Sequence, residues 1–366
     1  CGVGFKLIQA LGTKRNQSIE DFVPYLDLVA VAIAADIVPM NGENRILTYY
    51  GLQVLNQKPR NGIKAIIHQA KKKELTITDV VFIIAPRINA AGRMKHGNYA
   101  VELLTEMEFD AAVEFAAAIE IFNADRKELD KKITEEALIQ IIENNEEEKF
   151  TSVVFKEDWH KGVIGIVASR LIETYYRPTL VFTKSGDKLA ASARSVKGFD
   201  VYNALLQCEE FIDQFGGHKY AAGLTLSPEN YKKFKNKFEE VVAKTIDKQL
   251  LTPEISIDAK IELSDITPKF FRIIQQMGPF GPNNMKPVFK SDCVRDNGYG
   301  KTVGADKKHL KLSVFQGENK STLNTIGFNL GNKLKFVKDE FDIVYALEEN
   351  EWNGYKSIQL LLKDLR

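Results

Sequence analysis

The chain is poor in cysteine and contains no long hydrophobic run. Its three cysteines, Cys1, Cys208 and Cys293, are widely separated, and no C-x-x-C pair occurs among them. This spacing excludes a disulfide framework and the usual zinc motifs, and it is typical of a reducing cytoplasm. The longest apolar stretch, residues 28–35, is far shorter than the roughly 18 residues that a membrane span requires. We therefore expect a cytoplasmic protein without a membrane segment.

An excess of charge of one sign is also missing. The formal net charge is +1 for 366 residues, although 27% of them are charged. No global positive field attracts nucleic acid, so any DNA binding must depend on a local basic strip. The sequence has no Walker A motif, no H-E-x-x-H and no G-x-S-x-G, which argues against the enzyme classes that those motifs mark.

The length of the chain limits the number of domains, and its first residues show where it begins within a domain. At about 150 residues per domain we expect two or three domains, and we expect a monomer. The chain begins CGVGFKLIQAL, without methionine and with the pattern of a helix interior. No basic segment followed by an apolar stretch marks a signal peptide. We interpret the chain as a fragment whose natural N-terminus lies upstream.

Two periodicities divide the chain into regions. From 98 to about 143, apolar residues recur at helical spacing and predict one long helix or two nearly continuous ones. Residues 150–247 alternate between strand-like and helical segments, which predicts an α/β domain. After Pro253, five or six short strand-like segments predict a small barrel, and the loop GPFGPNN before most of them is interpreted as a rigid linker. Four helices are predicted nearer the start: residues 4–11, 26–39, 43–57 and 61–72.

Asp36 is the first residue that suggests chemistry. It lies in the apolar stretch DLVAVAIAADIVPM. A carboxylate among apolar residues is costly unless it is paired or bound to a metal. Asp36 is therefore either a helix-end aspartate that caps or forms an ion pair, or a metal ligand, and the residues alone leave both interpretations open.

The heptapeptide RINAAGR contains two arginines, Arg87 and Arg93, and is followed by His96. It comes after the apolar segment VVFIIAP, for which we predict a strand. Arginine suits bidentate phosphate contacts, and Gly92 allows the backbone to approach a ligand closely. Arg87, Asn89 and Arg93 are therefore candidates for phosphate binding. The alternative is a surface turn with solvated arginines.

A predicted helix begins within HKGVIGIVASRL, directly after the strand-like segment TSVVF. Gly162 and Gly165 lie near its start, where exposed backbone amides form an anion site. His160 is placed to cap this helix or to touch a phosphate. The alternative is a structural role, which is more usual for a lone histidine.

Two further segments, ASARS (residues 191–195) and FGGHKYAAG (residues 215–223), carry polar residues and glycines. Paired glycines let a loop approach a ligand closely, so both segments are able to converge on one phosphate. The alternative is a tight turn with a capping histidine. The candidates are Ser192, Arg194, Ser195, Gly216, Gly217 and His218.

Six segments together resemble the RecJ family of the DHH phosphoesterase superfamily, and they occur in the order typical of that family. The resemblance covers residues 1 to about 290, and the remaining tail matches the expected position of an OB-like barrel. The segments are DLVAVAIAADIVPM, RINAAGR, HKGVIGIVASRL, ASARSVKGFD, FGGHKYAAG and MGPFGPNN.

The resemblance implies a multidomain α/β fold. Residues 1–97 would form the C-terminal part of a DHH catalytic domain, and residues 98–149 a connecting helix. Residues 150–250 would form the α/β DHH-associated domain. Residues 251–366 would form the OB-like barrel, which binds nucleic acid by backbone charge and base stacking.

The resemblance also implies a 5′→3′ exonuclease that releases mononucleotides from single-stranded DNA in DNA repair and recombination. Hydrolysis would depend on Mn²⁺ or Mg²⁺, and Asp36 would be the last metal-binding aspartate of the catalytic domain. The segment Arg87–Arg93 would lie at the edge of the catalytic cleft. The candidates between 150 and 250 would grip the strand end and its 5′-phosphate. A single-strand-binding protein and a helicase are the implied protein partners.

The chain departs from the family pattern in its metal motifs. It lacks the upstream D-x-D and D-H-H motifs, and no H-H dipeptide occurs anywhere. Two-metal hydrolysis needs several carboxylates and histidines, so we expect the chain as given to be inactive but able to bind DNA. Two alternatives are a non-catalytic DHH-family nucleic-acid-binding protein and a nanoRNase or cyclic-dinucleotide phosphodiesterase. The β-rich residues 253–366 argue against the latter, because those enzymes usually lack the barrel.

Overall fold

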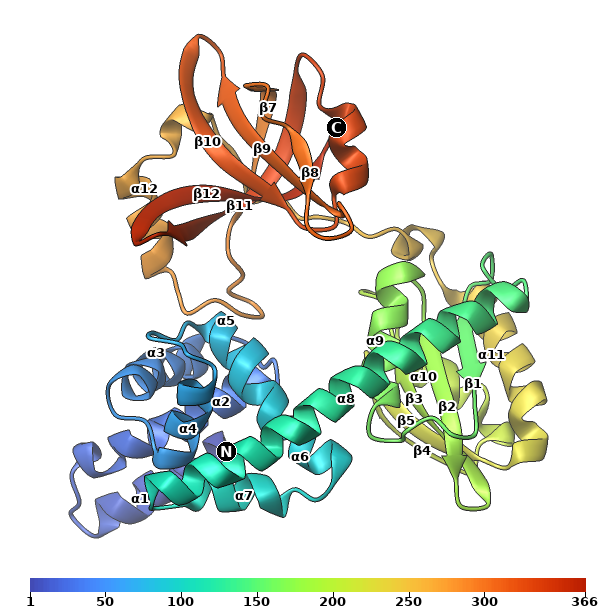
Figure 1. Ribbon diagram of the computed structural model, residues 1–366. Helices are drawn as coiled ribbons and strands as arrows, with labels where there is room; N and C mark the ends of the chain where they lie inside the picture. The colour runs from blue at the N-terminus through green and yellow to red at the C-terminus, as the bar shows by residue number, and fades with distance from the viewer. The chain divides into compact units, whose positions relative to one another are not determined.

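The structure is a computed structural model that describes residues 1–318 and 321–366 in full and the backbone alone at 319 and 320. The chain divides into two compact units, and Figure 1 labels the helices and strands that they contain. No helix among the described residues is long and apolar enough to cross a bilayer. The first unit comprises Cys1–Lys58, Glu74–Val81 and Glu254–Arg366, and the second comprises Pro59–Lys73 and Phe82–Pro253.

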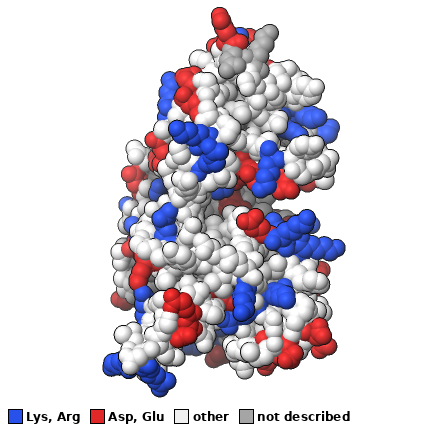
Figure 2. Space-filling view, turned by 90° about the vertical axis from the view of Figure 1, so that its left-hand side faces the viewer, with Lys and Arg blue, Asp and Glu red and all other residues white. Residues whose placement is uncertain are grey.

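Charged side chains of both signs are mixed on the surface. On the face shown in Figure 2, Lys and Arg lie interspersed with Asp and Glu. This agrees with the formal net charge of +1. Positive charge that attracts nucleic acid must therefore be concentrated locally.

The first unit begins with the helices that the sequence predicts. The alanines of α2 allow α3 to approach closely: a Cβ added to Gly51 would lie 2.4 Å from the carbonyl oxygen of Leu26 and 2.6 Å from Ala30 Cβ. A glycine is therefore needed where the two helices cross. The elements are α1 (Gly2–Lys14), η1 (Ile19–Tyr25), α2 (Leu26–Ala35), α3 (Gly42–Gln57) and α5 (Ile77–Asp79).

The same unit ends in a barrel, as predicted. The strand order is β6-β7-β11-β12-β10-β9-β8, and an additional pairing of β7 with β9 closes five of the strands into a ring. Apolar residues on alternate positions, such as Val294, Leu312 and Leu360, fill the interior. The elements are β6 (Ala259–Lys260), η6 (Leu263–Asp265), α12 (Pro268–Gln276), β7 (Val288–Asp296), β8 (Lys301–Val303), β9 (His309–Gln316), β10 (Asn319–Gly327), η7 (Gly331–Phe336), β11 (Phe341–Trp352) and β12 (Tyr355–Leu365).

Two sequence predictions for this region were wrong in detail. The segment EISIDAKIEL forms only the two-residue strand β6. Its apolar residues alternate as in a strand, but residues 252–260 are exposed and no core covers their apolar face. Helix α12 was not predicted at all. Its pattern PKFFRIIQQ is short, and its clearest signal is Thr267, whose hydroxyl accepts a hydrogen bond from the Phe270 amide as an N-cap.

The segment interpreted as a rigid linker is held against the helices of the first unit. The Met40 amide donates to the Pro282 carbonyl oxygen at 2.6 Å. The Arg45 guanidinium donates to the carbonyl oxygens of Gln276, Met277 and Gly278 at 3.0 to 3.4 Å. These carbonyls follow the end of α12, where a cation is favoured. Residues 276–282 therefore connect the helices of the first unit to its barrel through hydrogen bonds.

The second unit contains the long helical region that the sequence predicts, as two helices. The predicted strand VVFIIAP is helical instead: η2 and the start of α6 cover it. Val80 and Ile84 are fully buried one helical turn apart while Phe82 is 73% exposed, a helical rather than an alternating pattern. The helices are α4 (Asn61–Gln69), η2 (Val80–Ile84), α6 (Ala85–Met94), α7 (Asn98–Thr105) and α8 (Phe109–Glu143). The first two residues of η2 belong to the first unit.

After α8 the chain forms the predicted α/β domain around a five-stranded sheet of order β1-β2-β3-β5-β4. Val154 and Val181 on one face pack against α8 and α9. Leu180 and Phe182 on the other face pack against Phe234 of α11. The elements are β1 (Ser152–Phe155), α9 (Ile164–Thr174), β2 (Thr179–Ser185), β3 (Lys188–Arg194), α10 (Val201–Leu206), η3 (Glu209–Phe211), β4 (Gln214–His218), β5 (Ala221–Leu226) and α11 (Tyr231–Thr245).

The FGGHKYAAG segment is a β-hairpin rather than a ligand loop or an isolated turn. Strands β4 and β5 pair in antiparallel register from Gln214 to His218. Gly217 has φ of +155° and a Cβ there would lie 2.4 Å from the Ala221 carbonyl oxygen. The glycine is therefore needed by the hairpin itself.

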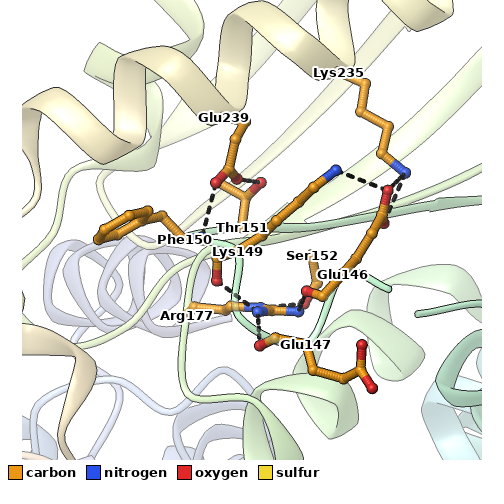
Figure 3. Close-up of polar contacts among 9 residues, drawn as sticks. All are labelled: Glu146, Glu147, Lys149, Phe150, Thr151, Ser152, Arg177, Lys235 and Glu239. Atoms are coloured by element: carbon orange, nitrogen blue, oxygen red, sulfur yellow. Dashed lines mark hydrogen bonds and ion pairs between the residues drawn. The ribbon is translucent and has the colours of Figure 1, made fainter. Parts of the chain in front are cut away.

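A buried arginine fastens the start of the α/β domain (Figure 3). Arg177 is only 4% exposed, and burial lowers its pKa. Its guanidinium donates to the Ser152 hydroxyl at 2.8 Å and to the carbonyl oxygens of Glu146, Glu147 and Lys149 at 2.9, 2.6 and 2.5 Å. The loop between α8 and β1 is thus wrapped around one cation.

Candidate nucleic-acid interface

One face of the sheet in the second unit carries four of the ten predicted phosphate ligands. Ser192 of β3 pairs with Gly223 of β5, which pairs with Gly216 of β4. Arg194 and His218 share one partner residue on β5, in the next row of the same face. Adjacent strands are about 4.8 Å apart, so the backbones at Arg194 and His218 are about 10 Å apart. The sequence prediction that these segments lie together follows from the strand register.

The first turn of α9 lies against Ser192 and Arg194 of β3. A Cβ added to Gly165 would lie 3.0 Å from Arg194 Nη2 and 3.0 Å from Ser192 Oγ. The guanidinium of Arg194 donates to the Ser192 hydroxyl at 2.9 Å. The dipole of a helix favours an anion at its N-terminal end, although the Ile164 and Ile166 amides of α9 already donate to the carbonyl oxygens of His160 and Val163. Arginine, hydroxyl and the start of a helix therefore meet at one point.

Arg93 approaches this point from the end of α6. Its guanidinium donates to the Gly162 carbonyl oxygen at 3.1 Å, and a Cβ on Gly162 would lie 2.2 Å from the Arg93 carbonyl oxygen. Burial lowers the pKa of Arg93. Burial and, to a lesser extent, the charge of Arg93 lower the pKa of Arg194. Two arginines that are distant in sequence thus lie close to the start of α9.

Neither Arg93 nor Arg194 forms an ion pair within the fully described ranges. Arg126 and Arg170 extend the positive charge. The pKa of Arg126 is lowered by its burial and by the charges of Arg170 and Arg93, against the raising effect of Asp130. Asp130 and Glu173 are the acidic residues that act on these arginines. The arginine cluster, Arg93, Arg126, Arg170 and Arg194, therefore has an excess of positive charge that a bound anion would neutralise.

Two other residues of the RINAAGR segment have different surroundings. Arg87 Nε lies 2.5 Å from Glu120 Oε2 of α8, and the Arg87 guanidinium donates to the Ile83 carbonyl oxygen at 2.8 Å. These contacts favour a structural role for Arg87. Asn89 is exposed on α6, one helical turn before Arg93, and is open to a ligand.

Three of the predicted ligands have local partners that hold the backbone. His160 Nδ1 accepts from the Gly162 amide at 3.1 Å, so it orders the turn before α9. The Ser195 hydroxyl donates to the Phe199 carbonyl oxygen at 3.0 Å. His218 Nδ1 accepts from the Tyr220 amide at 3.3 Å, which leaves the other ring nitrogen free to face a ligand.

Asp36 lies in the first unit, exposed, at the C-terminal end of α2. A two-metal site needs several carboxylates or histidines close together. In the part of the chain that the structure describes, no group of three or more His, Cys, Asp or Glu residues is arranged to hold a metal ion. The residues present therefore do not fit a metal centre on their own.

Helix α8 takes part in this site in a way that was not predicted from the sequence. Asp130 Oδ1 and Oδ2 accept from Arg170 Nε at 2.8 and 2.9 Å, and Asp130 lies 3.6 Å from Arg126 Nη1. The i,i+4 spacing of Arg126 and Asp130 in the predicted long helix was the available signal. It does not reveal that α9 brings Arg170 to the same place.

Comparisons with known proteins agree with the two domains described. The family model described as DHHA1 domain matches residues 147–244, and the model described as RecJ OB domain matches residues 257–364. The predicted fold class, with an α/β DHH-associated domain and an OB-like barrel, is thereby confirmed. The OB match also argues against the nanoRNase or cyclic-dinucleotide phosphodiesterase alternative.

Relatives match along the whole chain. It is 34% identical over 370 residues to the single-stranded-DNA-specific exonuclease RecJ of Bacillus subtilis, covering 99% of this chain and 46% of that protein. It is 32% identical over 391 residues to the protein of the same name from Escherichia coli, covering 100% of this chain and 66% of that protein. The chain thus spans about half to two thirds of these relatives.

A solved structure has the same arrangement of elements. The crystal structure of RecJ from Thermus thermophilus in complex with Mn²⁺ matches with a TM-score of 0.85 and 27% identity, covering 100% of this chain and 52% of that chain. The structure of RecJ from the same organism with Mg²⁺ matches with a TM-score of 0.83 and 26% identity, covering 100% of this chain and 55% of that chain.

Proposed function

Since the chain belongs to the RecJ family, we propose that its second unit binds the 5′-terminal phosphate of a single DNA strand. The complete protein would then remove mononucleotides in the 5′→3′ direction by metal-dependent phosphodiester hydrolysis, in DNA repair and recombination. The alternative of a non-catalytic nucleic-acid-binding protein would use the same phosphate site as a clamp.

The observation that carries this proposal is the approach of two guanidinium groups, the exposed Arg93 and the half-buried Arg194, to the start of α9. Two like charges close to each other without a counter-charge repel, and such groups are typical of functional sites. A terminal phosphate carries more negative charge than an internal phosphodiester, so it would gain most from two arginines. This difference is the basis of selectivity for a 5′ end.

Each side chain has a separate part in holding the phosphate. Arg194 and Arg93 would donate charge-assisted hydrogen bonds to the phosphate oxygens. The Ser192 hydroxyl and the Gly165 amide of α9 would donate to the remaining oxygens. Gly216 and His218 lie across the open sheet face, where the first nucleoside would follow the phosphate. Asn89 lies one helical turn from Arg93, and we propose that it also contacts the DNA strand.

The metal chemistry is assigned to the complete protein. Relatives have been solved with Mn²⁺ and with Mg²⁺, and we propose that the complete protein uses one of these ions to activate water and stabilise the leaving oxygen. Asp36 would contribute one ligand. The other ligands would come from outside this chain, because its described residues do not fit the ion.

We expect the site around Arg93 and Arg194 to bind a 5′-phosphate in preference to a 5′-hydroxyl. The affinity of the chain for a 5′-phosphorylated single strand should exceed that for the same strand with a 5′-hydroxyl. An Arg194→Ala variant should remove most of this difference and bind the phosphorylated strand about tenfold more weakly, because a charged hydrogen bond contributes about 1.5–3 kcal/mol. Fluorescence anisotropy at fixed salt measures both affinities.

A matched control is Arg15→Ala, which removes one exposed arginine from the first unit. It should leave the difference between phosphate and hydroxyl intact. Arg194→Ala should also melt at nearly the same temperature as the unaltered chain, since it relieves repulsion with Arg93 while losing two hydrogen bonds. Equal binding of both strand ends by the unaltered chain would contradict the proposal.

We also expect the chain by itself to release no mononucleotides. With Mn²⁺ and an end-labelled single strand, thin-layer or gel analysis should show intact DNA, because a single aspartate does not hold two metals. A variant Asp36→Asn should give the same result. Release of labelled mononucleotide by the purified chain, abolished by Asp36→Asn, would instead place a complete metal site within these residues.

Partners and location follow from the same assignment. We propose that the complete protein acts in the cytoplasm as a monomer on single-stranded DNA. A helicase would supply such a strand, and a single-strand-binding protein would keep it open. Size-exclusion chromatography with light scattering of the complete protein tests the oligomeric state.

A further inference from the structure

Asp130 of α8 is a buried carboxylate within the arginine cluster, and it is only 1% exposed. Its two oxygens accept from Arg170 Nε of α9 at 2.8 and 2.9 Å. Asp130 Oδ2 also lies 3.6 Å from Arg126 Nη1, one turn earlier on α8. A carboxylate removed from water is costly unless it is paired. The two guanidinium groups supply this pairing, so Asp130 is the buried counter-charge of the cluster.

The two partners of Asp130 differ in their surroundings. Arg126 Nη2 also donates to Asn123 Oδ1 at 2.9 Å, and the Arg126 side chain is 11% exposed. The Arg170 side chain is 46% exposed. Glu173 also raises the pKa of Arg170, but less than Asp130 does, and because Glu173 is exposed, water and salt screen its charge. Among the residues that the structure describes, Asp130 therefore has the strongest acidic influence on both arginines.

The charge of Asp130 is close enough to act on the proposed phosphate site. Arg170 follows Gly165 by five positions on α9, about 7.5 Å along the helix axis, and a Cβ on Gly165 would lie 3.0 Å from Arg194 Nη2. On the other side, the pKa of Arg126 is lowered by its burial and, among charges, by those of Arg170 and Arg93. Because Asp130 is buried, it acts on a bound phosphate through its charge and through its two partners, and not by contact.

The proposed reaction requires the phosphate site to release its ligand after every step. Water would add to the phosphorus of the first internal phosphodiester, and the bond from that phosphorus to the 3′-oxygen would break. The mononucleotide would leave with a 3′-hydroxyl and its original 5′-phosphate, and the shortened strand would carry a new 5′-phosphate. Both products compete for one site, so a site that binds a 5′-phosphate too tightly would retain the mononucleotide and delay the next step.

We propose that Asp130 is a positioning residue that limits the affinity of the site for a 5′-phosphate, so that the mononucleotide is released after each step. Its carboxylate offsets one of the four guanidinium charges of the cluster and fixes the side chains of Arg126 and Arg170. The inference rests on the proposed function and deepens it, since it assigns control of phosphate release to a residue that is not itself a phosphate ligand.

The test compares three variants of the full chain whose arginine clusters differ in net charge. Asp130→Asn removes the carboxylate charge but keeps the shape of the side chain, so the cluster becomes more positive. Arg170→Gln makes the cluster less positive. The double variant Asp130→Asn/Arg170→Gln leaves its net charge unchanged and replaces the ion pair by two neutral amides. Affinity for a 5′-phosphorylated single strand should be highest for Asp130→Asn, equal for the double variant and the unaltered chain, and lowest for Arg170→Gln.

Fluorescence anisotropy at fixed salt measures these affinities. Asp130→Asn should bind the 5′-phosphorylated strand at least about fivefold more tightly, and Arg170→Gln at least about fivefold more weakly, as expected for one unit charge about 8 Å from a terminal phosphate. The inhibition constant of deoxyadenosine 5′-monophosphate, measured by displacement of the labelled strand, should fall by a similar factor in Asp130→Asn. Binding of the same strand with a 5′-hydroxyl should change less, because that strand has no terminal phosphate.

Thermal melting separates this role from a purely structural one. Asp130→Asn should melt at a lower temperature than the unaltered chain, because two guanidinium groups lose their counter-charge. The 5′-phosphorylated strand should then raise the melting temperature of Asp130→Asn by more than that of the unaltered chain, since a tighter ligand stabilises the folded state more. A residue that only holds the fold together would not combine lower stability with higher affinity.

Glu128→Gln is the matched control. Glu128 is exposed on the same helix, and it is two positions from Asp130, so the two side chains do not face each other. The substitution removes the same charge from the solvent side of α8. It should leave the affinity for the phosphorylated strand and the inhibition constant of the mononucleotide unchanged.

Unchanged or weaker binding of the phosphorylated strand by folded Asp130→Asn would overturn the inference. If that variant does not fold, the double variant decides: affinity equal to that of the unaltered chain supports the inference, and affinity as low as that of Arg170→Gln contradicts it. Failure of the proposed function would be seen separately, as equal binding of 5′-phosphate and 5′-hydroxyl strands by the unaltered chain.

Discussion

Arg177→Ala is expected to lower the free energy of unfolding of the second unit by about 4 kcal/mol. The substitution leaves three backbone carbonyls and the Ser152 hydroxyl without the donor that they share. Each hydrogen bond from a charged donor contributes about 1.5–3 kcal/mol, and buried groups left without a partner add a desolvation cost. The contributions are not additive, so we take a value near that for breaking a buried ion pair, about 3–5 kcal/mol.

The measurement is thermal or urea unfolding of the full chain followed by circular dichroism. A loss of this size should lower the melting temperature of the second unit by about 10 °C. Arg177→Lys should be nearly as damaging, because an ammonium group has no planar fork to reach all four acceptors. The control Arg295→Ala removes an exposed arginine that pairs with Glu340, and it should cost less than about 1 kcal/mol. Similar losses in Arg177→Ala and Arg295→Ala would contradict the role given to burial.

Gly162→Ala is expected to damage both the fold and the phosphate site. The added Cβ would lie 2.2 Å from the Arg93 carbonyl oxygen and 3.0 Å from its carbonyl carbon. These are backbone atoms, so no side chain can rotate away, and α6 and α9 must move apart. Overpacking of this kind costs about 1–3 kcal/mol. The same movement separates Arg93 from Arg194, so the preference for a 5′-phosphate should fall at least about tenfold, as for loss of a charged contact.

Gly97→Ala is the matched control. Gly97 has φ of −60°, and a Cβ there meets no atom within 4 Å. It should leave the melting temperature and the binding preference unchanged. Binding of the Gly162→Ala variant must be measured well below its own melting temperature. If the variant then shows the same preference for a 5′-phosphate as the unaltered chain, the distance between α6 and α9 does not determine that preference.

The sequence allowed much of the fold to be predicted, because local patterns carried the necessary information. The helical spacing of apolar residues from 98 to 143 and the alternation of strands and helices after 150 each matched the observed elements. The prediction failed for VVFIIAP, since a short, fully apolar run has no periodicity that separates a strand from a buried helix. It also failed for EISIDAKIEL, where an alternating pattern occurs without a core to bury one of its faces.

The candidate site could be predicted only in part. Several of the segments proposed from the sequence as phosphate-binding lie close together in the structure, but which side chains point to one another depends on strand register and helix packing. Ser192 and Arg194 meet Gly165 because α9 begins over β3. The partner of Arg87, Glu120, lies 33 positions away in another helix, and nothing in the heptapeptide reveals it.

The contact between Met40, Arg45 and the end of α12 has a consequence for how this protein can be taken apart. Met40 is 2% exposed, and Gly281 packs directly on its side chain. A shortened gene that stops after Pro253 would therefore expose the Met40 side chain to solvent. It would also remove the carbonyl oxygens that accept hydrogen bonds from the Arg45 guanidinium. The last third of the polypeptide therefore covers apolar surface of the N-terminal helices in addition to forming the barrel.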